Sequence, residues 1–173
     1  EHDANAQSIL ITDSDSVAHA VKDCIEKNLK NLSRNEIAGQ SWSDNGAIIK
    51  VPDFNTAAAL SNRIAPEHLE LCVADPENLA KKISNAGAIF LGHWTPEAVS
   101  DYVTGPNHVL PTARSARFSS GLSVMDFLKR TTLAKVSRDA LLIFGPSAVT
   151  IAESEGLQCH GLSISERIKS NSE

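Results

Sequence analysis

The sequence contains little of what marks secreted, membrane-spanning or nucleic-acid-binding proteins. Its three cysteines, Cys24, Cys72 and Cys159, are far apart and never form a CxxC pair. This pattern excludes a disulfide framework or a zinc ribbon and favours a reducing compartment such as the cytoplasm. No apolar run is long enough to span a bilayer. The 16 basic and 21 acidic residues give a formal charge of −5, so the basic field of a general nucleic-acid-binding protein is missing.

The amino terminus also lacks familiar signals. It reads Glu1-His2-Asp3, with no Met and with neither the basic nor the apolar region of a secretory signal. A chain that starts in this way, directly before an apolar run, is expected to be a piece of a longer protein.

What is present is the composition of a globular domain with alternating strands and helices. Apolar residues make up 42% of the chain and charged residues 21%, both ordinary values. Short apolar runs predict strands, and the amphipathic stretches between them predict helices. The expected strands are 8–12, 47–51, 69–73 and 88–91, and the expected helices are 17–32, 53–64 and 76–85. This alternation predicts an α/β fold, a mostly parallel sheet with helices on both faces, as part of a Rossmann-like domain.

The pattern changes after residue 92. A short helix over 96–101 is expected to lead into a loop at 104–112 that is rich in Gly and Pro, and loops of this kind are often functional. From Ser137 the sequence is helical, and Gly145-Pro146 is expected to break or kink that helix. A last short helix is expected over 163–169.

Two parts are therefore predicted. Residues 1–122 form the α/β segment, which carries Glu67, His68 and the loop from Asp101 to His108. Residues 123–173 form a small C-terminal helical tail.

No dinucleotide-binding GxGxxG, glycine-rich phosphate loop or HExxH motif is present. The candidates for chemistry are therefore His and acidic residues in irregular places. Glu67 and His68 follow a proline at a loop-to-strand junction, where they can supply two proton-transfer groups to one pocket. The alternative is a solvent-facing Glu and a hydrogen-bonded His at a strand end.

Asp101 and His108 flank the long loop, and both residue types bind zinc or a polar substrate. In the alternative, Asp101 caps a turn and His108 lies on the surface. The tail offers a further set, Glu153, Glu155 and His160, which by itself reads as a solvated helix end.

Several longer stretches together resemble one family. They are Asn62–Leu71, Ala86–Gly92, Asp101–Thr112 and Arg117–Val124 with the following Asp126–Arg130. These stretches resemble the histidinol dehydrogenase family, and the resemblance extends over essentially the whole chain. It corresponds to the C-terminal part of that family's subunit.

The resemblance implies an activity and several residue roles. The family oxidises L-histidinol through the aldehyde to L-histidine in histidine biosynthesis, with two NAD and one zinc per active site. By resemblance, His68 is the base of the hydride transfers and also contacts the substrate, and Glu67 activates the water that hydrates the aldehyde. Asp101 is a zinc ligand and substrate contact, and His108 is a substrate contact.

The resemblance also implies a homodimer with a shared site. His160, as zinc ligand and substrate contact, and Glu155, as substrate contact, are offered to the neighbouring subunit. His2 matches another zinc ligand, while the family's Gln ligand and its NAD-binding segment fall before Glu1. The chain is thus expected to hold three of the family's four zinc ligands and no NAD-binding residue, and to be inactive in isolation.

Two other functions stay open. The first is a zinc-dependent dehydrogenase of another small polyol, which substrate assays distinguish from a histidinol enzyme. The second is a non-catalytic dimerisation or regulatory module, which has no chemical need for the set Glu67, His68, Asp101, His108 and His160.

Overall fold

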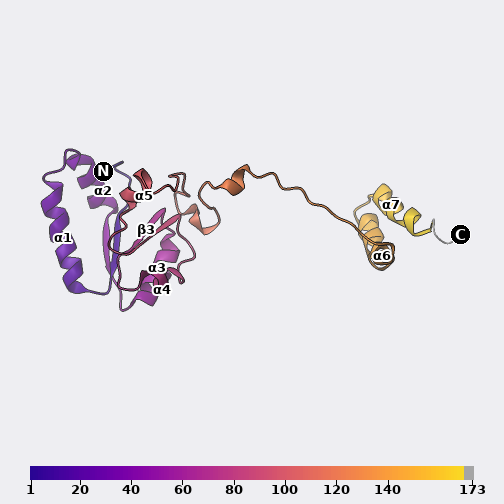
Figure 1. The fold of residues 1–173 in the computed structure, drawn as a ribbon, viewed down its shortest axis with the longest axis horizontal. Coiled ribbons are helices and arrows are strands. Elements are labelled where there is room, and N and C mark those ends of the chain that lie inside the picture. Colours follow the sequence, from indigo (N-terminus) through magenta and orange to yellow (C-terminus); the bar gives the residue numbers. More distant parts are fainter. Residues whose placement is uncertain (170–173) are drawn as a thin grey trace. The chain divides into compact units, whose positions relative to one another are not determined.

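The computed structural model describes residues 1–169. The chain divides into two compact units, Glu1–Phe127 and the residues from Leu128 onward (Figure 1). All strands of the described residues lie in the first unit, and the second consists of two helices. The predicted α/β class with parallel strands is confirmed.

The first part of unit 1 is a parallel strand pair with a helical connection. Strands β1 (Ile9–Thr12) and β2 (Ala47–Lys50) pair in register, Ile9 opposite Ala47. The connection contains α1 (Asp15–Leu29) and α2 (Asn35–Asn45). Parallel strands need a long connection of this kind, because a tight turn reverses the chain direction and joins only antiparallel strands.

The second part of unit 1 repeats this arrangement and carries the compact core. Helix α3 (Phe54–Ile64) leads to β3 (His68–Leu71), and α4 (Pro76–Ala80) connects it to the parallel strand β4 (Ala88–Leu91). The core cluster consists of Ala58, Leu71 and Leu79. After β4 follow α5 (Glu97–Tyr102) and two 3-10 turns, η1 (Ser115–Arg117) and η2 (Val124–Phe127).

The structure differs from the sequence-based expectation in two details of this unit. The four strands of the described residues pair as two separate two-stranded sheets, β1-β2 and β3-β4. Helix α2 was not expected because Gly39 and its many polar residues weaken the helical pattern. Its place is fixed by long-range hydrogen bonds, from Ser41 Oγ to Ala6 O (2.8 Å) and from Asn45 Nδ2 to Ala4 O (3.1 Å).

Unit 2 is a pair of packed helices, α6 (Arg138–Ser154) and α7 (Gln158–Lys169). Gly145-Pro146 was expected to break or kink this helix, and the break does not occur, since α6 continues through Pro146. A Cβ on Gly145 would lie 2.8 Å from Ile168 Cδ1 and 3.1 Å from Ile164 Cγ2, so α7 packs closely there. This packing offsets the hydrogen bond that the proline cannot donate.

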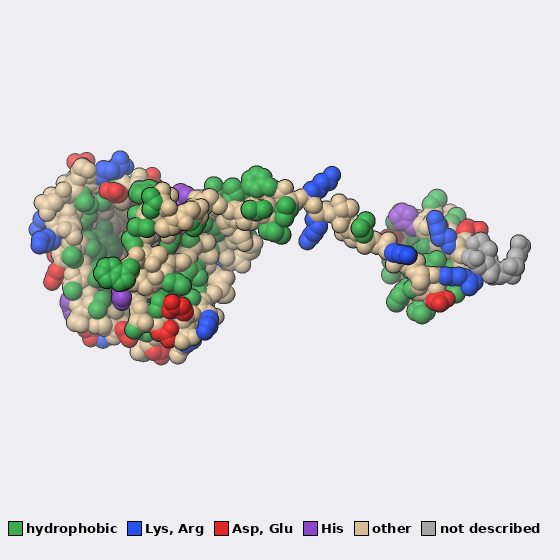
Figure 2. Space-filling view, in the orientation of Figure 1, with side chains coloured by type: hydrophobic (Ala, Val, Ile, Leu, Met, Phe, Trp, Pro, Cys, Tyr) green, Lys and Arg blue, Asp and Glu red, His purple; other side chains and the backbone are tan. Residues whose placement is uncertain are grey.

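Many apolar side chains near the start of unit 2 and on its helices are exposed (Figure 2). Leu133 is 94% exposed and Ile143 71%. No element is assigned to residues 128–136. Within residues 1–169, every helix is too short or too polar to cross a membrane.

Gly87 provides a test of the packing that positions β3. A Cβ at Gly87 would lie 2.6 Å from the carbonyl oxygen of Glu67, a backbone atom that cannot rotate away. We expect Gly87→Ala to lower the free energy of unfolding by about 2 kcal/mol, measured by urea denaturation. Gly39→Ala is the control, because nothing lies within 4 Å of its added Cβ and Ala is the better helix former. Equal midpoints for the two variants would contradict the assigned contact.

Candidate functional site

Strand β3 and helix α5 form the framework of the site. Side chains two apart in a strand point to the same face, so His68 and Glu70 both face α5. Glu70 Oε1 accepts a hydrogen bond from the backbone N–H of Glu97 at 2.8 Å. Pro96, the N-cap residue of α5, makes no side-chain cap bond. Glu70 therefore takes the place of a local cap and fixes the start of α5 beside His68.

Four titratable side chains meet at this junction. Glu97 and Asp101 lie one helical turn apart on the same face of α5. With His68 and His108 they form a group in which one ligand atom of each residue lies within 4.8 Å of the others. His68 Nε2 is 3.8 Å from Glu97 Oε1, and His108 Nδ1 is 2.8 Å from Asp101 Oδ2. Two imidazoles and two carboxylates thus share one small volume.

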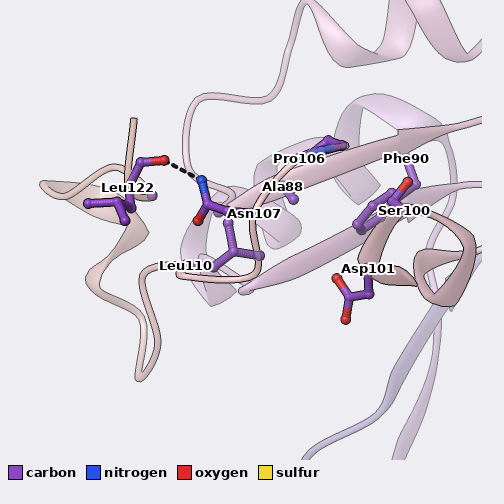
Figure 3. Close-up of a pocket in the computed structure, with 10 residues that line it drawn as sticks. Ala88, Phe90, Ser100, Asp101, Pro106, Asn107, Leu110 and Leu122 are labelled. Carbon is purple, nitrogen blue, oxygen red and sulfur yellow. Dashed lines mark hydrogen bonds between the residues drawn. The ribbon is translucent and has the colours of Figure 1, made fainter. Parts of the chain in front are cut away.

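The loop after α5 brings His108 to this group. Asn107 organises the loop, since its Oδ1 accepts from Val109 N (2.9 Å) and its Nδ2 donates to Leu122 O (2.5 Å). Leu122 N donates in turn to Val109 O at 2.9 Å. Figure 3 shows the contact between Asn107 and Leu122. The loop is therefore an ordered structure, and the position of His108 follows from it.

The rings of the site are stacked. The His108 ring lies on the His68 ring with centroids 5.5 Å apart and an interplanar angle of 16°. The ring of Phe90 in β4 also lies near His68, tilted by 33° with centroids 5.9 Å apart. His68 Nε2 is buried and has no hydrogen-bond partner within the described residues. A buried polar atom without a partner is costly, so this nitrogen is well suited to bind a polar atom of a substrate.

The carboxyls and His108 influence each other's protonation. The hydrogen bond between Glu97 and Asp101 raises the pKa of Glu97 and lowers the pKa of Asp101. Glu97 is therefore the member of the pair that holds a proton more readily. The hydrogen bond to Asp101, and then its charge, raises the pKa of His108, to which the nearby charge of Glu67 also contributes.

A pocket of about 250 Å³ adjoins this group at Asp101, and Figure 3 shows the residues that line it. It shares Phe90 and Asp101 with the site and is otherwise lined mainly by β4 and the loop. The further lining residues are Gly87, Ala88, Ser100, Pro106, Asn107, Leu110, Gly121 and Leu122. An apolar pocket beside a few polar groups is a common form of a small-molecule site.

The structure brings some of the residues proposed from sequence together. His68, Asp101 and His108 lie in one group, and Glu67 directly precedes His68. His2 is not in that group.

The two tail residues belong to unit 2, where Glu155 caps α6 and His160 lies in the first turn of α7. Their roles, like that of His2, stay predictions.

Sequence reasoning missed Glu97. The available signal was its spacing of four residues from Asp101 in a predicted helix, which places both on one face.

The donor chemistry of the group fits a zinc ion. Zinc in proteins is bound by imidazole nitrogens and carboxylate oxygens, and the group contains two of each. Of the four side chains, that of Asp101 is the least exposed, at 16%, so its carboxylate is the most shielded donor of the group.

The Asp101–His108 pair predicts a measurable titration. We expect the His108 ring to titrate above the ordinary value of about 6.5, because Asp101 favours its charged form. Because the pKa of His108 is higher in the folded state, the pair contributes its full stabilisation of the fold below the unfolded pKa. That contribution is lost as the pH rises through the folded pKa. NMR titration of Asp101→Asn should return the midpoint toward the ordinary value. Asp44→Asn, an exposed change in α2, should leave it unchanged, and equal shifts would contradict the pairing.

Comparisons with known proteins identify the family. A family model described as Histidinol dehydrogenase matches residues 1–168. The histidinol dehydrogenases of Ruegeria pomeroyi and Cereibacter sphaeroides are each 63% identical over 168 residues, 97% of this chain and 39% of each relative. The crystal structure of histidinol dehydrogenase from Elizabethkingia anophelis matches with a TM-score of 0.85 and 37% identity, over 98% of this chain and 39% of that one. The chain therefore spans 39% of the length of these relatives, and it belongs to the histidinol dehydrogenase family.

Proposed function

We propose that these residues form the C-terminal part of a histidinol dehydrogenase subunit. The subunit would oxidise L-histidinol through L-histidinal to L-histidine in the cytoplasm, and the 173 residues alone would be inactive. The observation that carries the proposal is the buried His68 Nε2, which has no hydrogen-bond partner among residues 1–169 and lies among Glu97, Asp101 and His108. Family membership supports the same activity.

His68 is the proposed catalytic base. Imidazole is the usual side chain for proton transfer near neutral pH. Its Nε2 would accept the hydroxyl proton of histidinol during the first oxidation, and the proton of the hydrated aldehyde during the second. The stacked His108 ring and the Phe90 contact restrict the orientation of His68, which keeps this nitrogen in place for both steps.

Glu67 is the proposed base for the water that adds to the aldehyde. It lies beside His68 in the chain, and its charge acts on His108, so its carboxylate is close to the ring that we propose as a substrate contact. Its backbone carbonyl accepts from Ala88 N at 2.8 Å. The backbone that carries the carboxylate is therefore fixed by the pairing of β3 with β4.

Asp101 is the proposed zinc ligand of unit 1, together with His2. The third zinc ligand would be His160 of the partner subunit. Glu155 of the partner subunit would contact the substrate. Zinc, when bound, would hold the imidazole and amine of histidinol in place. The exposed apolar side chains of unit 2, such as Ile143 and Leu157, support a homodimer because surfaces of this kind usually pack against a partner.

NAD is the proposed hydride acceptor, bound by a part of the subunit outside these residues. The described residues do not fit a dinucleotide site of the usual type, because no GxGxxG turn links a strand to a helix.

Three substitutions in the whole subunit test the residue roles. We expect His68→Asn to lower turnover of histidinol at least about 100-fold while zinc content, measured by elemental analysis, stays at the wild-type level. Asp101→Asn and His160→Asn should each lower zinc content. Loss of zinc in the His68 variant, or full zinc in either of the others, would show that the assignment is wrong. Parallel assays with other small polyols identify the substrate class.

Mixed dimers test the shared site. Subunits carrying His68→Asn and subunits carrying His160→Asn are each expected to be nearly inactive. A mixed dimer contains one site with both residues intact if His160 acts across the interface, so mixing should restore up to about a quarter of the wild-type activity in a statistical mixture. If mixing restores nothing although heterodimers form, His160 acts within its own subunit or not at all.

A further inference from the structure

Two arginines that follow the loop, Arg114 just before η1 and Arg117 at its end, bind the same backbone atom. Arg114 Nη2 donates a hydrogen bond to the carbonyl oxygen of Arg63 at 2.7 Å, and Arg117 Nη2 donates to that same oxygen. Arg63 lies in the last turn of α3, where carbonyl groups lack a partner within the helix and the helix dipole is negative. Two cationic donors are therefore well matched to this acceptor. We call these contacts the arginine clamp.

The backbone on both sides of the clamp is strained. Within residues 1–169, the non-glycine residues with positive φ are Ala65 (53°), Ala113 (49°) and Arg114 (67°). Ala65 ends α3, and the other two directly precede η1. L-residues adopt this conformation only where other contacts hold them there. All of this strain is thus concentrated where the loop meets the end of α3.

The clamp lies next to the segment that carries Glu67 and His68. The turn after Arg63 is also held by the residue just before β4, since Gly87 N donates to Pro66 O at 2.9 Å. Pro111 of the loop packs over the same glycine, within 3.2 Å of the position that a Cβ would take. The loop is therefore attached to both sides of the turn that precedes His68.

We infer that Arg114 and Arg117 are positioning residues, which hold His108 stacked on His68. The loop is anchored at its near end by the pair of Asp101 with His108 (2.8 Å) and at its far end by the clamp. With both ends fixed, the two rings stay 5.5 Å apart and almost parallel. The consequence for the substrate rests on the proposed function, but the geometric claim does not.

The geometric claim is tested on this chain with the double variant R114M/R117M. The readout is the nuclear Overhauser effect between the carbon-bound ring protons of His68 and His108. We expect the cross-peak of the wild-type chain to be lost in the double variant. Arg63→Met is the matched control, because it removes an arginine from the same junction but keeps the carbonyl group that accepts both bonds. A cross-peak that persists in the double variant, or that is missing in the wild-type chain, overturns the inference.

A second variant separates positioning from folding. Arg114→Gly removes one guanidinium and also relieves the positive φ at this position. It should therefore unfold at a urea concentration no lower than the wild-type chain while its cross-peak weakens at least about twofold. An unweakened cross-peak in a folded Arg114→Gly chain counts against the clamp.

The effect on the substrate is measured in the whole subunit. A misplaced contact residue weakens binding, so we expect R114M/R117M to raise KM for histidinol about tenfold with zinc content unchanged. A purely structural defect would lower kcat through the active fraction and leave KM unchanged, and that result would contradict the positioning role. If the wild-type subunit does not oxidise histidinol, the proposed function fails. The cross-peak still tests whether the arginine clamp positions His108.

Discussion

A helix of six residues cannot hold its own position in water, so the place of α5 depends on the carboxylate of Glu70. That carboxylate comes from a neighbouring strand and binds the first backbone N–H of α5 at 2.8 Å. Because His68 lies on the same face of the strand, one contact fixes both the strand side and the helix side of the site. The approach of Glu97 and Asp101 to the two imidazoles follows from it.

Elements that depend on the local sequence could be predicted, whereas features that depend on distant contacts could not. The strands followed from their apolar, β-branched runs, since such residues favour extended backbone. Helix α2 was missed because it depends on Ser41 and Asn45 binding a distant segment. The continuity of α6 through Pro146 likewise depends on packing against α7, at Gly145. Local propensity contains no information on such contacts.

The site divides in the same way. His68, Asp101 and His108 were visible as chemically suitable residues in irregular segments. The part played by Glu97 was not, because its meaning depends on where α5 lies relative to β3. The contacts of Arg114 and Arg117 could not be predicted either, because both guanidinium groups bind the carbonyl oxygen of Arg63, which is distant in the sequence. Residue types suited to the chemistry can be read from the sequence, whereas the contacts between these residues depend on the tertiary structure.

The alternation of side chains along β3 has a consequence for how this part of the chain can evolve. His68 and Glu70 serve the site only while both point to the face of α5. Losing or gaining one residue between Pro66 and Glu70 would rotate the imidazole or the carboxylate to the opposite face. Insertions and deletions should therefore be tolerated in residues 128–136, which form no helix or strand. Between Pro66 and Glu70 they should be eliminated by selection.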